Sequence, residues 1–265
     1  MSMAYQPGSD DPSPSLHFAC TSCGKCCTGL RLPLSVSEAI TWLERGGRVE
    51  ILCDAAPDMP FPEGSAEAYR AARAVPAISD QLPLTLSATL TAVFEGPCPN
   101  LQADMRCGAY EIRPNACRIY PAEVRPDRRV VPTEKLCPSD AWDDAHPTFM
   151  EPAQGVLDME TANAITRSRH AGIDDVGRKA GLLAALHIDQ AALANEGYAI
   201  WKPSLDTLLD RLRAVRDAQD GTAPDRLYVE ILSPRAETRQ MIAEAQGVDA
   251  VPDSTRGYDY LPLYG

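Results

Sequence analysis

The stretch Cys20-Thr21-Ser22-Cys23-Gly24-Lys25-Cys26-Cys27 places four cysteines within eight residues. Thiolate is a soft, strongly donating ligand that suits zinc, iron–sulfur clusters and cuprous copper. Gaps of two residues let successive cysteines turn back toward one centre, and the first three have the spacing of a bacterial ferredoxin-type cluster site. The stretch therefore predicts a metal or iron–sulfur site in an irregular, cysteine-rich part of the chain.

More cysteines follow, and their number suggests more than one simple site. Cys26 and Cys27 are adjacent, and neighbouring side chains point in different directions, so the pair fits poorly on one tetrahedral zinc. We therefore expect two centres or one multinuclear centre, and the spacing leaves zinc and iron–sulfur both open. The predicted metal ligands are Cys20, Cys23, Cys26, Cys27, Cys98, Cys107, Cys117 and Cys137. The ninth cysteine, Cys53, is expected to be a spare thiol.

A disulfide framework is the alternative use of so many cysteines. It is disfavoured because a chain of 265 residues can bury a core without covalent staples. Residues 1–15 are polar, contain three prolines and lack the apolar run of a signal peptide. No stretch is apolar enough to span a bilayer. The cytoplasm, where thiols stay reduced, is therefore the expected location, and no membrane partner is expected.

The charge pattern bears on the partners of the protein. A formal charge of −12 argues against a nucleic-acid partner, which normally needs a basic stripe. Residues 106–135 nevertheless hold seven bases and four acids, and they include Cys107 and Cys117. Such neighbours would stabilise an anionic thiolate site, although a solvated basic surface explains the pattern equally well.

The pattern of apolar residues predicts an α+β fold that is predominantly helical. The capping box Ser35–Glu38 starts a helix over 36–45, and strict alternation over 84–94 predicts a strand that delivers Cys98 to the site. Residues 53–64 are expected to be loop. Further helices are predicted over 159–169, 174–187, 189–196, 205–215 and 234–245, with a short strand over 227–232.

These elements suggest three parts of the chain. Residues 1–15 are expected to be a disordered N-terminus, residues 16–140 an irregular cysteine-cluster domain with a few short strands, and residues 141–265 a helical C-terminal region. The expected fold is thus a cysteine-rich metal-binding core followed by helices.

The cysteines also occur in a recognisable context. The segments concerned are Phe18–Gly29, Cys98–Leu101, Cys107–Pro121, with its Tyr-Glu-x-Arg-Pro-x-x-Cys-Arg pattern, and Cys137–Pro138. Over about residues 16–140 the chain resembles the YkgJ-like cysteine-cluster proteins, or CxxCxxCC family, described as zinc- or iron-chelating. The resemblance implies metal binding through the eight cysteines, with no settled general reaction. Arg113 and Arg118 of this context are expected to lie beside the ligands, where they would hydrogen-bond thiolates, offset their charge or form an Arg–Glu bridge that holds the turn.

Three functional hypotheses follow. The first is a cytosolic protein that binds iron, as an iron–sulfur cluster, or zinc, with a redox or metal-handling role. The second is a cluster-dependent enzyme that modifies a protein, because the cysteine domain is similar to part of flagellin lysine N-methylases. The third is an interaction protein that the metal stabilises and whose acidic C-terminal half binds a protein partner. No catalytic residue is identified, and whether the chain is an enzyme stays open.

Overall fold

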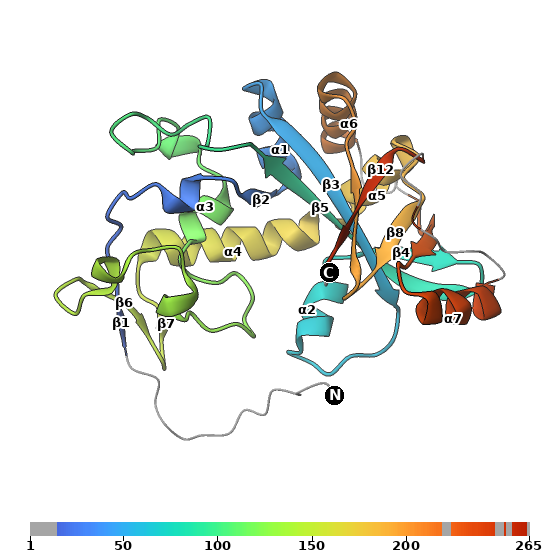
Figure 1. Ribbon diagram of the computed structural model, residues 1–265, viewed down its shortest axis with the longest axis horizontal. Coiled ribbons are helices and arrows are strands. Elements are labelled where there is room, and N and C mark those ends of the chain that lie inside the picture. The colour runs from blue at the N-terminus through green and yellow to red at the C-terminus, as the bar shows by residue number, and fades with distance from the viewer. Residues whose placement is uncertain (1–14, 219–223, 247–251, 253–255, 264–265) are drawn as a thin grey trace.

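The computed structural model describes residues 15–218, 224–246, 252 and 256–263 (Figure 1). In this part of the chain, a mixed sheet of nine strands runs in the order β10-β4-β5-β3-β8-β11, with β2 paired to β5, β9 to β3 and β12 to β9. Its strands are β2 (Arg31–Leu34), β3 (Arg48–Pro57), β4 (Val75–Ser79), β5 (Leu82–Val93), β8 (Gln190–Leu193), β9 (Gly197–Trp201), β10 (Leu227–Tyr228), β11 (Glu230–Leu232) and β12 (Tyr258–Pro262). The sheet draws strands from both sides of residue 140.

A smaller sheet and a set of short helices build the cysteine-rich side of the molecule, on the left in Figure 1. The small sheet has the order β1-β6-β7, with β1 (Leu16–His17), β6 (Thr148–Glu151) and β7 (Gly155–Val156). The helices of the chain are α1 (Val36–Glu44), α2 (Ala66–Ala71), α3 (Asn115–Ile119), α4 (Met159–Asp174), α5 (Val176–Ala185), α6 (Leu205–Asp217) and α7 (Ala236–Gln246). Helix α4 runs from the cysteine-rich side toward the large sheet.

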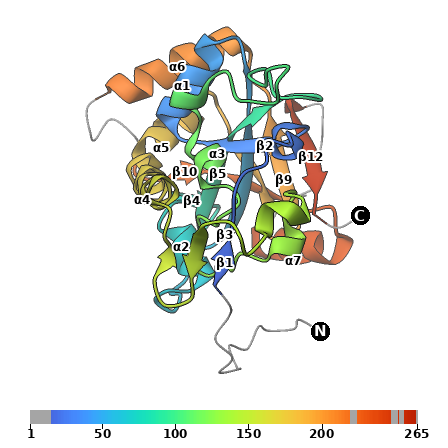
Figure 2. The same ribbon diagram turned by 90° about the vertical axis from the view of Figure 1, so that its left-hand side faces the viewer.

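Two hydrophobic cores hold these parts together. The main core lies between the large sheet and α1, α5 and α6, and Ile51, Leu90 and Leu208 are fully buried in it. Helices α1 and α6 pack against each other at one end of the sheet (Figure 2). The second core joins α3 to α4 and β6 through Ile119, Ala164 and Phe149. Burial of such side chains contributes about 1.5–3 kcal/mol each.

The prediction of a predominantly helical fold is wrong. The structure is 35% helical and 26% strand, and its centre is a large mixed sheet. Strand β3 includes residues 53–57, the first part of the segment 53–64 that was expected to be loop, because it is a central strand buried on both faces and shows no alternation. The rest of that segment, over 58–64, contains no helix or strand. Strand β8 lies where a helix over 189–196 was expected. Its alanines favour a helix locally, but pairing with β3 and β11 prevails.

Other expectations are confirmed. The capping box at Ser35 and Glu38 begins α1, and the alternating stretch forms β5. Helices α4, α5, α6 and α7 lie at the predicted places, with ends that shift by up to a few residues. The region from 141 onward is nevertheless not simply helical, since it supplies β8, β9 and β12 to the large sheet. Of the N-terminus predicted to be disordered, residues 1–14 lie outside the described residues.

Candidate metal centre

A tight turn at Gly24, whose left-handed backbone favours glycine, lies among the first four cysteines. Gly24 has φ +70° and precedes the short 3-10 helix Lys25–Cys27. A Cβ at Gly24 would lie 2.1 Å from Cε of Met105, the movable end of an exposed side chain, so the positive φ is the main reason for glycine here. The Cys27 N–H donates to the Gly24 carbonyl at 2.9 Å and closes the turn. The turn thus fixes Cys26 and Cys27 on one rigid support.

Backbone hydrogen bonds bring the second cysteine segment against the first. After β5 ends, the Cys98 N–H donates to the Cys27 carbonyl at 2.6 Å, and the Gly29 N–H donates to the Gly96 carbonyl at 2.8 Å. A β-bridge between Leu101 and Cys107 folds the next loop back toward the same place. The strand therefore delivers Cys98 beside the first turn, as its position in the sequence predicts.

Four thiols influence one another on the side of the turn that faces α3. Burial raises the pKa of the Cys117 thiol to about 12, and the thiols of Cys98, Cys27 and Cys107 add to the rise. Burial likewise raises the pKa of Cys98, with Cys27 and Cys107 as its interacting thiols. We call Cys27, Cys98, Cys107 and Cys117 the α3 set.

The remaining four thiols form a second neighbourhood. The pKa of the Cys26 thiol is raised to about 12, first by burial and then by Cys27, Cys137 and Cys20. Burial also raises the pKa of Cys137, whose interacting thiols are Cys23 and Cys20. We call Cys20, Cys23, Cys26 and Cys137 the Cys137 set. The two sets are adjacent because Cys26 of one set precedes Cys27 of the other in the chain. The Cys27 thiol also interacts with the thiols of Cys20 and Cys23.

The thiols are neighbours, but they are not drawn in to coordination distance. Across residues 15–218, 224–246, 252 and 256–263, no three or more His, Cys, Asp or Glu side chains are grouped closely enough to hold a metal ion. The donor set itself fits zinc or iron in kind, because it consists of soft sulfur ligands on a glycine-dependent turn. All nine cysteines are free thiols.

The two predicted arginines bind a carboxylate that the sequence did not single out. Glu160 at the start of α4 accepts hydrogen bonds from Arg118 at 2.7 Å and from Arg113 at 3.2 Å. Arg118 also donates to the carbonyls of Tyr110 and Glu111, at 3.1 and 2.6 Å. The Arg113 charge opposes the rise in the pKa of Cys117. The arginines therefore brace the turn before Cys117, and an Arg–Glu bridge exists, with Glu160 rather than Glu111.

Sequence reasoning also passed over the neighbours of Cys137. The Tyr120 hydroxyl accepts a hydrogen bond from the Leu136 N–H at 2.5 Å, and by hydrogen-bonding the Cys137 sulfur it opposes the rise in the pKa of that thiol. Lys135, which pairs with Glu123, acts in the same direction through its charge. The only signal in the sequence was the closeness of Lys135 to Cys137.

The structure also shows the surroundings of His17 and Cys53. His17 makes a hydrogen bond between its Nδ1 and the His146 carbonyl at 2.8 Å. Cys53 is fully buried in β3, within the main core. In the described residues, no helix has both the length and the apolar character needed to cross a membrane.

The segment from Cys20 to Cys137 is thus a domain that gathers eight thiols around one glycine turn. Residues 19–138 match the family model CxxCxxCC, whose description is "Putative zinc- or iron-chelating domain", and these residues belong to that family. The match supports chelation of zinc or iron. No curated protein and no solved structure matches the chain.

Proposed function

We propose that the eight cysteines bind zinc or iron, the latter as an iron–sulfur cluster, in two neighbouring centres. The α3 set, Cys27, Cys98, Cys107 and Cys117, would hold one centre, and the Cys137 set, Cys20, Cys23, Cys26 and Cys137, would hold the other. The observation that supports this proposal is that Cys26 and Cys27, whose thiols hydrogen-bond each other, differ in their more distant thiol neighbours. Cys26 interacts with Cys137, whereas Cys27 interacts with Cys107.

The protein's own residues hold the thiols and set their protonation. Buried thiols such as Cys26 and Cys117 carry their protons at neutral pH, so metal binding must release protons from them. Arg113 favours the thiolate form of Cys117, and Tyr120 and Lys135 do the same for Cys137. When bound, iron would supply one-electron chemistry, whereas closed four-thiolate zinc would supply a cross-link.

A redox or metal-handling role in the cytosol suits this arrangement best. Four protein thiolates fill the coordination sphere of a tetrahedral metal and leave no open position for a substrate. Thiols stay reduced in the cytosol, where cysteine clusters serve metal or redox chemistry. The alternative of a protein-modifying enzyme is tested by calorimetry with S-adenosylmethionine on the metal-loaded protein. The alternative of an interaction protein is tested by partner capture.

The decisive experiment is metal, acid-labile sulfide and visible absorption analysis of anaerobically purified protein. The variants C107S and C137S each remove one ligand from one set, and C53S is the matched control. We expect each ligand variant to lose about half of the metal, because the other set is intact, and C53S to lose none. A folded wild-type protein without metal would overturn the proposal. Complete metal loss in both ligand variants would instead indicate one multinuclear centre.

A further inference from the structure

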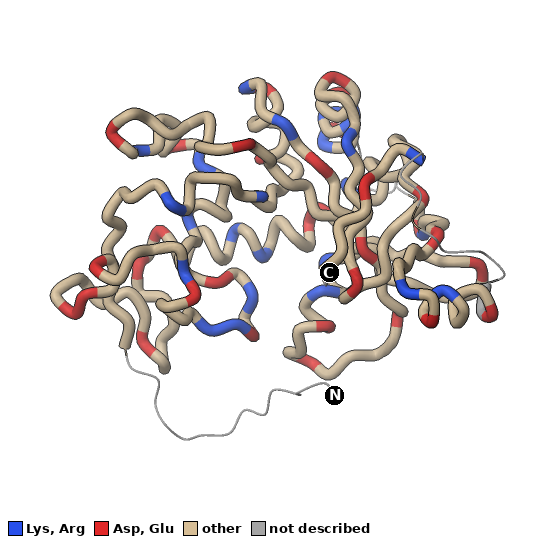
Figure 3. Tube along the Cα trace, viewed as in Figure 1, with Lys and Arg blue, Asp and Glu red and all other residues tan. Residues whose placement is uncertain are grey.

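A cleft of about 770 Å³ separates the cysteine-rich side from the large sheet. One wall is formed by α2, β3 and β9, and the other by α3 and the α4–α5 segment. In Figure 3, Lys and Arg positions are visible in α2 and in the loop over 125–129, and both segments contribute residues to the lining of the cleft. The volume is in the range of pockets that bind small molecules.

The α4–α5 wall places one lysine in the cleft. Ser168, Ala171, Gly172, Asp175 and Lys179 line it at intervals of three and four residues, which is one face of a helix. The first three side chains are small and leave space in front of the wall. Lys179 stands at the far end of this face, and the charge interaction between Lys179 and the buried Cys53 of β3 affects the pKa of both groups.

In the described part of the chain no carboxylate lies within ion-pair distance of Lys179, although the Asp175 charge opposes the fall in the pKa of the lysine. Among the residues that the structure describes, none forms an ion pair or hydrogen bond with its ammonium group. The nearest acid, Asp175, is already used, because it accepts hydrogen bonds from the Val36 N–H at 2.8 Å and from Arg178 at 3.0 Å. Burial lowers the pKa of Lys179. A largely buried cation whose only nearby acid is shared with other donors is costly, so the site favours an incoming anion.

The other lysines of the chain are in a different situation. Lysine occurs at only four positions, Lys25, Lys135, Lys179 and Lys202. Lys135 pairs with Glu123, Lys202 pairs with Asp259, and Lys25 is exposed on the cysteine turn. Lys179 is therefore chemically distinct from the rest.

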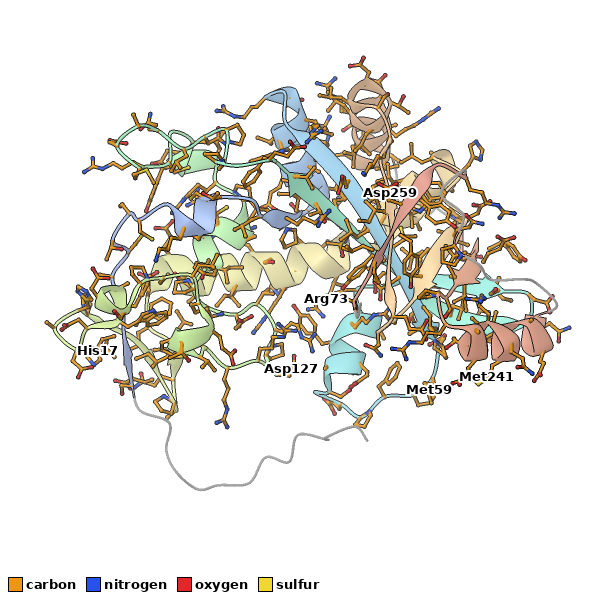
Figure 4. The ribbon with its side chains drawn as sticks, in the orientation of Figure 1. His17, Met59, Arg73, Asp127, Met241 and Asp259 are labelled. Carbon is orange, nitrogen blue, oxygen red and sulfur yellow. The ribbon has the colours of Figure 1, made fainter. Side chains whose placement is uncertain are left out.

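A second cation in the cleft also lacks an acidic partner. Arg73 donates to the backbone carbonyls of Tyr69 at 2.9 Å and Arg169 at 3.3 Å, and its Nε is buried without an acceptor. Its guanidinium carbon lies 3.6 Å from the centre of the Tyr69 ring. In Figure 4, Arg73 lies between α2 and the end of α4. No carboxylate pairs with it in the described part of the chain.

Most other charges that line the cleft are neutralised by neighbours. Arg70 pairs with Asp54 at 2.7 Å, and Arg125 pairs with Asp127 at 2.6 Å. The Glu38 carboxylate accepts hydrogen bonds from the N–H groups of Ser35 and Asn115 at the starts of α1 and α3. Glu67 also lines the cleft, in the first turn of α2. Lys179 and Arg73 are thus the cations left for a ligand.

We propose that this cleft binds a small organic anion, a carboxylate or a phosphate, whose charge is held by Lys179 and Arg73. Tyr69 and Tyr198, which line the cleft, would contact the body of the ligand. None of the residues named for this site is a proposed metal ligand, although α3, which carries Cys117, forms part of the wall.

The test uses pyridoxal 5′-phosphate, an aldehyde that carries a phosphate, with plain pyridoxal as the matched neutral probe. The Lys179 amine attacks the aldehyde carbon, a C=N bond forms and water leaves. Cyanoborohydride then adds hydride to the imine carbon while nitrogen takes a proton, and peptide mass spectrometry locates the label. We expect Lys179 to be labelled about tenfold faster by the phosphate probe than by pyridoxal, because a charge-assisted contact is gained. Metal content is measured before and after, so failure of this site is distinguishable from failure of the metal centres.

The variants R73M and R73K separate charge from folding. R73M should slow labelling of Lys179 by the phosphate probe while labelling by pyridoxal stays unchanged, and R73K should restore part of the rate. K202M is the control and should change neither rate. Equal labelling by the two probes, or preference for Lys25 or Lys202 over Lys179, would overturn the proposal.

Discussion

The Glu160 carboxylate accepts a hydrogen bond from Arg118 Nη1 at 2.7 Å and so ties the first turn of α4 to the helix that carries Cys117. Arg118 is largely buried, and its other donors reach the carbonyls of Tyr110, Glu111 and Arg113. One guanidinium therefore holds four chain positions around the α3 set. Arg118 therefore helps to hold the turn and helix that present Cys117.

Replacement of Arg118 by lysine should weaken the metal centre more than the fold. Lysine keeps the charge but cannot donate to several acceptors at fixed angles. We expect about 1–3 kcal/mol lower unfolding free energy and roughly 10–100-fold faster metal loss to a chelator. Denaturant titration and chelator competition measure the two effects. R213K, at an exposed pair with Glu44, is the control and should change neither; an equal effect there would contradict the role given to Arg118.

Replacement of Gly24 should weaken the turn that holds the cysteines. In G24A the methyl group would meet Met105, and the backbone would keep a positive φ at about 1–2 kcal/mol. Metal content should fall in both sets, because the turn carries cysteines of both. G29A has a similar φ of +62° but nothing near its Cβ, so it isolates the backbone cost. The double variant G24A/M105A should recover part of the loss, and no recovery would show that the contact with Met105 is unimportant.

The parts of the fold that were predictable have strong local signals. The capping box at Ser35 begins α1, and strict alternation defines β5, which has one well-buried face. Strand β3 has no such signal, because neighbouring strands cover both edges and its faces are both buried. Its existence depends on partners such as β9, about 150 residues later, and no local pattern reports such pairing.

The candidate site shows the same limit. The cysteine spacing and context identified the chelating domain, and the family match confirms it. Which thiols share a centre depends on how Cys137 and Cys107 return to the first turn, and their assignment as ligands stays a prediction. Glu160 was missed because it lies 42 residues beyond Arg118 and reaches it only through the packing of α4 on α3.

Cys53 should behave as a core residue and not as a ligand. It is fully buried in β3, far in sequence from the other cysteines and within the main core. C53V keeps the volume and should cost less than about 1.5 kcal/mol, whereas C53S buries a hydroxyl and should cost more. Both variants should keep the full metal content. Loss of metal from a folded C53V protein would show that the ninth thiol belongs to a centre.

Lys179 should give the stability of the protein a specific dependence on pH. Burial lowers its pKa in the folded state below the ordinary 10.5, so between those two values the unfolded chain binds more protons. The unfolding free energy must therefore rise with pH through that window, and the cost of the buried charge is largest below it. Urea titrations at about pH 7 and about pH 9.5 measure the rise, and K179M should flatten it.

Lys202 is the matched control of opposite sign. Its hydrogen bond with Asp259 raises the pKa of Lys202, so this bond stabilises the fold only until the pH passes that raised pKa. K202M should therefore leave the rise intact or make it steeper. A rise that persists unchanged in K179M would mean that the Lys179 ammonium is not held away from water, and it would remove the reason for an anion to bind there.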